Sequence, residues 1–381
     1  MSGAFDSGPQ TILVIQLGTK STGPRHAVGI TKALLEKNIP VTLLISKNFS
    51  ETNSHLVDTN VLRVMSALNT YTNKFTLIGR ILKVKALQNK FMEILNENKP
   101  TLIILPMQHF LDPFLFRCIS KFKLDNEVVI VSFVHDGIAH PGDSRLLNWC
   151  LMRFTKYYSD LVVVMSNFVA QRIRSITKKP ILKIALPVDL GIDSFQESGI
   201  LGLRKQNQIL FCGRLVKYKG LKRMSESWEF IQKEIPDANL VVAGEGKNRL
   251  IQGYFSELRN VQVINRFLTN AELDKLIQES RVVALPYDEA SQSGIMTKAV
   301  MFKTWYVVTP LEGLIEQNML LGGGSISEDM TSRAFAESIL KILRHGEPGN
   351  QESNDKINWQ SQLEIILDKV GEIINEPKRG Y

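Results

Sequence analysis

The chain has 381 residues but only three cysteines, Cys118, Cys150 and Cys212, and no two of them form a CxxC pair. An odd number of scattered cysteines excludes a disulfide framework and a zinc knuckle. No run approaches the ~18 apolar residues of a membrane-spanning helix. The first ten residues, MSGAFDSGPQ, lack the basic-then-apolar order of a signal peptide. We therefore expect a cytoplasmic protein, whose only membrane contact would be at the inner surface.

Several signature motifs are also missing. No GxGxxG follows the first apolar run, which disfavours a dinucleotide dehydrogenase. No GxxxxGK[ST] is present, so a P-loop ATPase is excluded, and the absence of GxSxG removes the commonest hydrolase signal. No two aspartates are spaced as DxD, the usual metal clamp of single-domain nucleotide-sugar transferases. We therefore expect neither a metal nor a cofactor.

What the sequence does contain is an ordinary globular composition, with 44% hydrophobic and 22% charged residues. The length is that of about two domains. The charge is uneven: residues 1–190 hold 23 basic and 13 acidic residues, and residues 191–381 hold 23 basic and 25 acidic residues. The net charge of +8 therefore comes from the first half.

Short apolar runs alternate with helix-like segments in both halves, a pattern typical of doubly wound parallel sheets. The predicted strands are residues 11–17, 41–46, 101–107, 128–135, 161–166, 208–213, 239–244, 260–266, 281–287 and 305–309. The predicted helices include residues 28–38, 220–234, 270–280, 294–303 and 357–374, and another that Ser166 caps. The pattern loosens over residues 185–207, which we take as the linker. We predict Rossmann-like domains over 1–190 and 191–355, and a final helix over 356–381.

Ligands of open α/β sheets bind at the carboxyl ends of strands, so the turns after the strands are the candidate sites. In the second half, GRLVKYKG places Arg214 and Lys219 between Gly213 and Gly220, and two cations can neutralise a diphosphate. A surface turn with solvated charges is the alternative interpretation. A second glycine turn, AGEGKNR, contains Gly244 and is weak evidence by itself.

The segment DEASQSGIMTKAV follows another predicted strand. Ser291, Ser293 and Gly294 lie where a helix is predicted to start, and the backbone N–H groups there could point at an anion. A plain N-cap turn explains the same residues.

In the first half, Gly18 and Gly23 mark a loop that ends at Arg25 and His26. FVHDGIAHPGD brings His135, Asp136 and His140 after a buried strand, where acid–base chemistry and a structural hydrogen bond are both open. The Pro-Gly after His140 argues against a helix that presents both histidines to a metal.

Four segments in order, FCGRLVKYKG, LVVAGEGKNR, NRFLTNAELDKLIQESRVVALPY and EASQSGIMTKAV, resemble the donor-binding domain of family 4 glycosyltransferases. The resemblance implies the GT-B fold, α/β with two Rossmann-like domains facing a cleft, and a retaining mechanism that needs no metal. It also implies that the final helix, over 356–381, crosses back to the first domain. It implies that Arg214 and Lys219 hold the donor diphosphate, that His135 lies near the transferred sugar, and that Gly23 belongs to a loop closing over the donor. The expected catalytic residues are Arg214, Lys219 and His135; the donor-binding residues Gly23, Gly213, Gly244, Arg266, Phe267, Leu268, Glu289, Gln292, Ser293 and Gly294; the acceptor-binding residues Arg25, Asp136 and His140.

The sequence departs from this family at its signature of two glutamates separated by seven residues. Lys298 replaces the second glutamate, which is expected to hold the ribose, and Asp288 and Glu289 lie near the first with the wrong spacing. ASQSG followed by a non-acidic residue resembles a bacterial polysaccharide-type subgroup.

The resulting hypothesis is a hexosyltransferase that moves a sugar from a UDP- or GDP-sugar to a glycan or lipid-linked glycan, in bacterial surface polysaccharide synthesis. Basic and apolar residues interleave over 72–91 and 146–158, which suits an anionic membrane surface. No nucleic-acid motif is present, so nucleic acid is not an expected partner. A nucleotide-sugar epimerase of the same fold and a non-catalytic sugar-nucleotide or glycan-binding protein are the alternatives.

Overall fold

The computed structural model describes residues 11–18, 22–46, 49, 63–64, 84–109, 111–135, 145–187, 205–345 and 357–375. The chain divides into two compact units. The first contains residues 1–184 and 359–381, and the second contains residues 185–358. The boundaries expected from the sequence were 190/191 and 355/356, a few residues from those of the structure. The two units are described separately.

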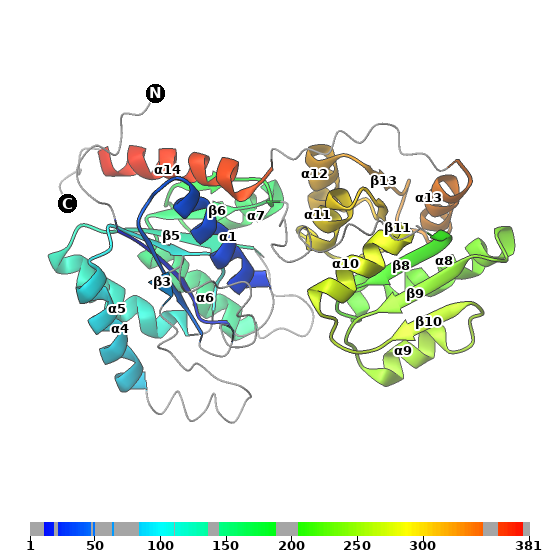
Figure 1. The fold of residues 1–381 in the computed structure, drawn as a ribbon, viewed down its shortest axis with the longest axis horizontal. Coiled ribbons are helices and arrows are strands. Elements are labelled where there is room, and N and C mark those ends of the chain that lie inside the picture. Colours follow the sequence, from blue (N-terminus) through cyan, green and yellow to red (C-terminus); the bar gives the residue numbers. More distant parts are fainter. Residues whose placement is uncertain are drawn as a thin grey trace. The chain divides into compact units, whose positions relative to one another are not determined.

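The first unit is built on a seven-stranded sheet of order β3-β2-β1-β4-β5-β6-β7, in which every pair is parallel (Figure 1). Its strands are β1 (Ile12–Gln16), β2 (Val41–Ile45), β3 (Arg63–Val64), β4 (Leu102–Leu105), β5 (Val129–Val134), β6 (Leu161–Val164) and β7 (Ile181–Lys183). β1, β2, β4 and β6 are buried along their whole length. Continuous apolar runs form them because helices cover both faces of a parallel sheet.

Helices connect these strands and bury the apolar faces of the sheet. They are α1 (Thr22–Glu36), α4 (Val84–Asn98), α5 (Asp112–Asp125), α6 (Arg145–Tyr158) and α7 (Asn167–Arg174). Ser166 caps α7 as predicted, because its hydroxyl accepts a hydrogen bond from the Val169 backbone N–H.

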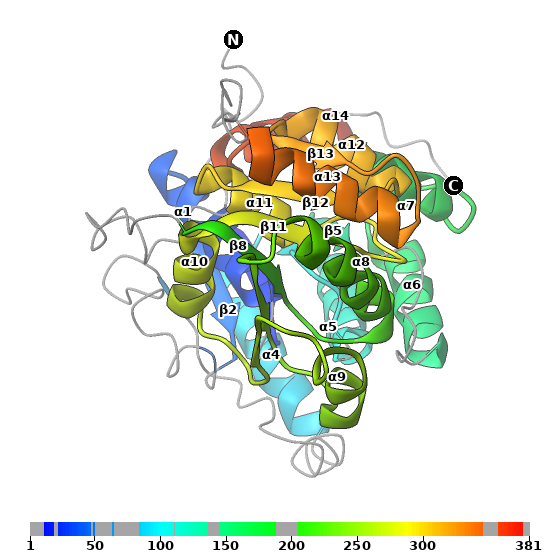
Figure 2. The same ribbon diagram turned by 90° about the vertical axis from the view of Figure 1, so that its right-hand side faces the viewer.

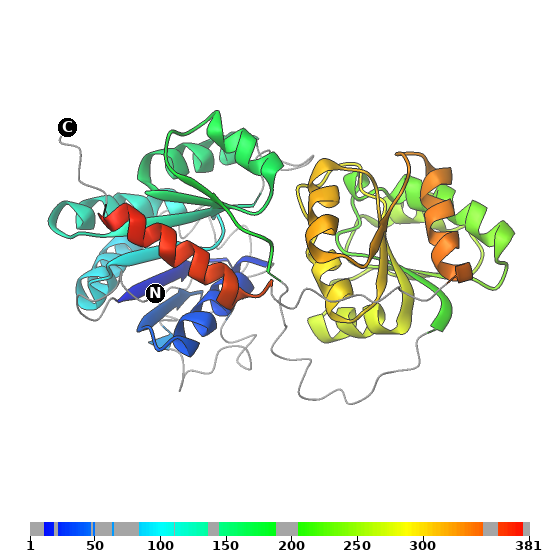
Figure 3. The same cartoon turned by 90° about the horizontal axis from the view of Figure 1, so that it is seen from above.

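The final helix, α14 (Trp359–Asn375), packs on the first unit although it follows the second in the chain (Figure 3). It lies along α1, where Trp359 sits directly against Gly29. Lys37 pairs with Glu364, and Gln360 donates a hydrogen bond to Glu36. These contacts make α14 part of the first unit's structure.

The second unit has a six-stranded parallel sheet of order β10-β9-β8-β11-β12-β13. The strands are β8 (Lys205–Cys212), β9 (Asn239–Ala243), β10 (Val261–Ile264), β11 (Ser280–Leu285), β12 (Trp305–Val308) and β13 (Gly324–Ile326). Alternate residues of the central strands enter two different cores, because successive side chains of a strand point to opposite faces.

One core lies beneath α8 (Leu221–Glu234), α9 (Asn248–Phe255) and α13 (Ser332–His345). The other lies beneath α10 (Asn270–Glu279), α11 (Gly294–Met301) and α12 (Glu312–Leu321). Figure 2 shows these two sets of helices around the strands. A short 3-10 helix, η1 (Lys217–Lys219), precedes α8.

The strands predicted from apolar runs are all present, with ends that differ by up to three residues. β3, β7 and β13, with two or three residues each, were not predicted, since such short edge strands leave no periodic signal. Within the described residues, no helix is long and apolar enough to span a bilayer.

Candidate functional site

The candidate donor site of the second unit lies where the strand order reverses. β8 and β11 are neighbours, and the chain continues outward to β9 from β8 and to β12 from β11. Such a switch point leaves a crevice at the carboxyl ends of the two strands. The structure places Gly213 and Arg214 after β8, and Pro286 and Tyr287 after β11. Two turns far apart in sequence therefore meet at one place.

Glycines allow these turns to approach closely. Gly213, Gly220 and Gly244 have φ of 117°, 79° and 144°, values that only glycine adopts readily. A Cβ on Gly244 would lie 1.8 Å from the Gly213 carbonyl oxygen, and one on Gly220 would lie 1.7 Å from the Pro286 carbonyl oxygen. The glycine turns singled out separately in the sequence are thus packed together as one surface.

The two candidate cations are held by tyrosines. The Arg214 guanidinium donates from Nη2 to the Tyr218 hydroxyl at 2.5 Å. The Lys219 Nζ lies 3.6 Å from the centroid of the Tyr287 ring and 5.4 Å from that of Tyr218. The Arg214 side chain is exposed. These contacts orient both cations near the carboxyl ends of β8 and β11.

The loop before α11 differs from the prediction in one respect. The Ser293 backbone N–H was expected to point at an anion, but it donates to Gln317 Oε1 at 2.7 Å, and Gln317 Nε2 donates back to the Ser293 carbonyl at 3.0 Å. This amide is therefore already used inside the protein. Gly294, the first residue of α11, is exposed, and a Cβ there would meet nothing within 4 Å. The N-terminus of α11 remains open to a ligand at Gly294.

Lys298, which stands where the ribose glutamate was expected, is buried inside the second unit. Its Nζ lies 2.5 Å from Asp274 Oδ1 on α10, and the two side chains are 10% and 5% exposed. The buried thiol of Cys212 is nearby at the end of β8, and burial raises its pKa to about 12 despite the positive charges of Lys298 and Lys219. The thiol therefore stays protonated and is not a nucleophile.

Arg266 and Phe267, two of the predicted donor-binding residues, are exposed. Arg266 makes a two-pronged ion pair with Glu272, at 2.6 and 3.0 Å, and Phe267 is 67% exposed. Hydrogen bonds from Arg266 and Thr269 lower the pKa of Glu272 to about 2. Leu268 is partly buried against the core. The backbone of this segment is thereby fixed, while the Phe267 ring is presented to solvent.

The acidic residues before the ASQSG segment have different surroundings. Asp288 pairs with Arg223 at 2.7 Å, and the same guanidinium donates to the Pro286 carbonyl. Glu289 is exposed and Gln292 is half-buried. Asp288 thus helps to fix the loop, and Glu289 stays a predicted donor contact.

In the first unit, the predicted loop after β1 is shorter than expected. Helix α1 already begins at Thr22, so Gly23 and Arg25 are helical, and the prediction that Gly23 lies in a flexible loop is wrong. Pro24 explains the early start, because its fixed φ suits the first turn of a helix. A Cβ on Gly23 would lie 2.1 Å from Gln16 Nε2, so this glycine serves close packing against β1.

His135 follows β5, and its Nε2 lies 2.8 Å from the Pro106 carbonyl oxygen. Since a carbonyl only accepts, Nε2 carries a proton and donates this hydrogen bond. The ring of His26 packs 5.0 Å away, and Trp359 packs 5.2 Å from His26. Burial, with the charges of His135 and Arg25, holds the pKa of His26 well below its usual value. Asp136 and His140, the other predicted acceptor contacts, lie outside the described residues, as do most of residues 72–91.

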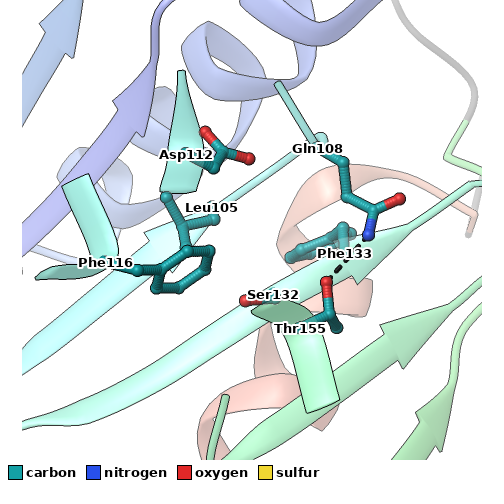
Figure 4. Close-up of a pocket in the computed structure, with 7 residues that line it drawn as sticks. All are labelled: Leu105, Gln108, Asp112, Phe116, Ser132, Phe133 and Thr155. Atoms are coloured by element: carbon teal, nitrogen blue, oxygen red, sulfur yellow. Dashed lines mark hydrogen bonds between the residues drawn. The ribbon is translucent and has the colours of Figure 1, made fainter. Parts of the chain in front are cut away.

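A small pocket between β4, β5, α5 and α6 is lined partly by polar side chains (Figure 4). Gln108 donates to the Thr155 hydroxyl at 2.8 Å. Burial raises the pKa of Asp112 to about 8, although the His109 backbone N–H, 2.6 Å away, favours the carboxylate. Burial also lowers the pKa of the His109 ring to about 3. These side chains bond to one another and to the backbone, so we assign them to the fold of the first unit.

Three residues around the donor site were not predicted: Tyr218, Tyr287 and Gln317. Tyr218 and Tyr287 belong to the motifs GRLVKYKG and RVVALPY. An aromatic residue next to the end of a strand is usually interpreted as part of the hydrophobic core. Gln317 lies 24 residues beyond the loop it binds, and no local pattern marks it. Across the described ranges, no three His, Cys, Asp or Glu side chains lie close enough together to hold a metal ion.

Comparison with known proteins supports the same interpretation of the second unit. Residues 194–359 match the family described as Glycosyl transferases group 1. The search of curated protein sequences gives no match.

Solved structures resemble the whole chain at low sequence identity. Sucrose-phosphate synthase from Thermosynechococcus elongatus has a TM-score of 0.68 and 13% identity, covering 97% of this chain and 100% of its own. HepE of Anabaena, solved in complex with UDP and glucose, has a TM-score of 0.63 and 13% identity, with 96% and 99% covered. UDP-GlcNAc 2-epimerase of Methanocaldococcus jannaschii has a TM-score of 0.63 and 11% identity, with 95% and 99% covered. The chain therefore has the GT-B fold, as predicted.

Proposed function

We propose that this protein is a glycosyltransferase that uses a nucleoside-diphosphate sugar as donor. The observation that carries the proposal is the pair of cations at the switch point of the second unit: Arg214 beside Tyr218, and Lys219 over the Tyr287 ring. Both lie in the segment that matches the glycosyltransferase family. HepE, which shares the fold, was solved with UDP and glucose, and this supports a UDP-sugar as the first donor to test.

The proposed chemistry follows from where charge develops. As the bond between the sugar carbon and the diphosphate oxygen breaks, negative charge builds on the departing diphosphate, and fixed cations stabilise that transition state. Arg214, Lys219 and the Gly294 end of α11 would supply this stabilisation without a metal ion. The acceptor oxygen bonds to the sugar carbon on the same face, and its proton passes to the departing phosphate oxygen. This front-face step retains the configuration and needs no protein nucleophile, in keeping with the inert Cys212 thiol.

We propose the first unit as the acceptor-binding part, with His135, which the Pro106 carbonyl oxygen orients, as a candidate acceptor contact. The excess of ten positive charges over residues 1–190 suits a phosphorylated, lipid-linked glycan acceptor in surface polysaccharide synthesis. Flotation with neutral vesicles and with vesicles containing anionic lipid tests the membrane contact. Binding only to anionic vesicles is expected, and equal failure to bind both would refute it.

The cation assignment has a direct test. Arg214→Ala and Lys219→Ala should each lower kcat by about 10²–10³-fold, the loss typical of removing one transition-state donor. Lys217→Ala is the matched control, because Lys217 lies in the same turn and is exposed. Its kcat should stay within about twofold of the unchanged protein's. Near-normal turnover by either of the first two variants would contradict the proposed function.

The epimerase remains the second candidate, since an epimerase shares the fold at a similar TM-score. Incubation with a UDP-sugar and no acceptor separates the two: an epimerase converts the sugar, whereas a transferase at most hydrolyses it slowly. Thermal shifts with UDP-, GDP- and ADP-sugars identify the base first, because a ligand that binds the folded state raises its stability by mass action. A shift without any turnover would instead indicate a non-catalytic sugar-nucleotide-binding protein.

A further inference from the structure

The two candidate cations contact different parts of their tyrosine partners. Lys219 Nζ is 3.6 Å from the Tyr287 ring centroid, so it contacts the face of the ring. Arg214 instead contacts the Tyr218 hydroxyl at 2.5 Å and is 5.8 Å from the centroid of that ring. A ring face holds Lys219, whereas a hydroxyl oxygen holds Arg214.

Tyr287 is fixed from several directions. It is 1% exposed and belongs to the core beneath α10, α11 and α12. The Thr309 hydroxyl donates to its carbonyl oxygen at 2.6 Å, and its own hydroxyl lies 3.4 Å from the Ser293 hydroxyl. Burial raises the pKa of Tyr287, so the phenol stays neutral. The ring is therefore a rigid, uncharged platform at the end of β11.

A neutral platform suits a cation that has to bind an anion. The face of an aromatic ring attracts a cation through its quadrupole, and the net charge of the cation is unchanged. The lysine stem, which has many rotamers in solution, is thereby ordered before the ligand arrives.

We propose that Tyr287 and Tyr218 are positioning residues for the donor diphosphate: the Tyr287 ring orients Lys219, and the Tyr218 hydroxyl orients Arg214. The proposal rests on the proposed function, because it concerns the same two cations. It predicts that donor binding responds differently to the loss of a ring or of a hydroxyl at the two positions. The ring matters at residue 287 and its hydroxyl does not, whereas the hydroxyl matters at residue 218.

The first experiment measures kcat, KM for the donor sugar nucleotide, and the Kd of the free nucleoside diphosphate for point variants. Tyr287→Phe should stay within about twofold of the unchanged protein, and Tyr287→Leu should lose about tenfold in kcat/KM, the size of a desolvated cation–π contact. Tyr218→Phe should lose about fivefold, the size of one hydrogen bond. Tyr306→Leu is the control for truncating a buried tyrosine of the same core, and it should change the melting temperature but not the Kd.

The second experiment keeps the shape of the ring and changes only its π density. Phenylalanines with one, two and three ring fluorines are placed at position 287, and the Kd of the nucleoside diphosphate is measured. Affinity should fall step by step with fluorination in a Lys219 background and stay flat in Lys219→Ala. A flat series in both backgrounds overturns the proposal, even if Tyr287→Leu does not fold. Full activity of Lys219→Ala would instead overturn the proposed function, so the two failures are distinguishable.

Discussion

At the scale of single residues, the ion pair of Lys298 and Asp274 keeps the only charged side chain of α11 inside the second unit. Both side chains are buried, and the ammonium is held by a carboxylate of α10, within the second unit. A residue that looked from the sequence like a substituted ribose contact thus has a structural partner. We expect donor recognition in this chain to rely on the diphosphate cations rather than on a ribose carboxylate from α11.

Breaking this pair should cost stability. Lys298→Ala leaves Asp274 buried and unpaired, and the free energy of unfolding should fall by about 3–5 kcal/mol in urea titrations. Lys298→Met combined with Asp274→Leu should recover most of the loss, because apolar residues of similar volume replace buried pairs well.

The control residue lies on α10, the helix that carries Asp274. Lys275 pairs with Glu279 at 3.8 Å, and the Lys275 side chain is 75% exposed. Lys275→Ala should change the free energy of unfolding by no more than about 0.5 kcal/mol. A Lys298→Ala variant as stable as Lys275→Ala would show that the buried pair is not formed.

At the scale of elements, the packing of α14 on α1 depends on one small residue, Gly29. Gly29 lies within α1, where the Trp359 indole of α14 fills the space that a side chain would take. Trp359 also packs against Phe133 of β5, so α14 connects α1 with the sheet of the first unit. Lys37–Glu364 and Gln360–Glu36 add polar contacts at the surface of the same helix pair. The pairing of α1 and α14 thus depends on Gly29.

Gly29→Ala should destabilise the protein although alanine is the better helix former. The added Cβ would lie 2.4 Å from Trp359 Cδ1, and overpacking of this kind costs about 1–3 kcal/mol. Gly253→Ala in α9 is the matched control, since a Cβ there meets nothing within 4 Å and should add about 0.5–1 kcal/mol. Urea unfolding measures both. Similar free energies of unfolding for the two variants would contradict the packing of α14 on α1.

At the scale of the whole molecule, the chain forms two units that are not two continuous stretches of sequence. The first unit is completed by residues 359–381, which come after the second unit. Each unit has its own parallel sheet and its own cores. The positive charge excess belongs to residues 1–190, while the candidate diphosphate site belongs to the second unit.

Deletion of residues 359–381 should therefore destabilise the first unit. The second unit, which directly precedes the deleted residues in the chain, should keep its stability. Hydrogen exchange should show lost protection in α1 and β5, which contact α14, and near-normal protection in β8, β9 and β11. Loss of protection in β8–β11 alone would contradict the assignment of α14 to the first unit. The Kd of a nucleoside diphosphate, measured on the same truncated protein, should change by less than about threefold if it folds, since every proposed diphosphate contact lies in the second unit.

The sequence by itself determined the α/β class and the strands of four or more residues, because apolar runs buried on both faces leave a strong local signal. The GT-B fold followed from the resemblance of four motifs to a known family. It also singled out Arg214 and Lys219 as candidate diphosphate ligands between two glycines, and the structure shows that Gly213 and Gly220 both have positive φ. Only the tertiary structure decided what those cations contact and what Lys298 does. Tyr287 meets Lys219 across 68 positions, Gln317 reaches back to Ser293, and Asp274 meets Lys298 from a different helix. Such pairings depend on which strands lie side by side, and no local pattern of residues carries that information.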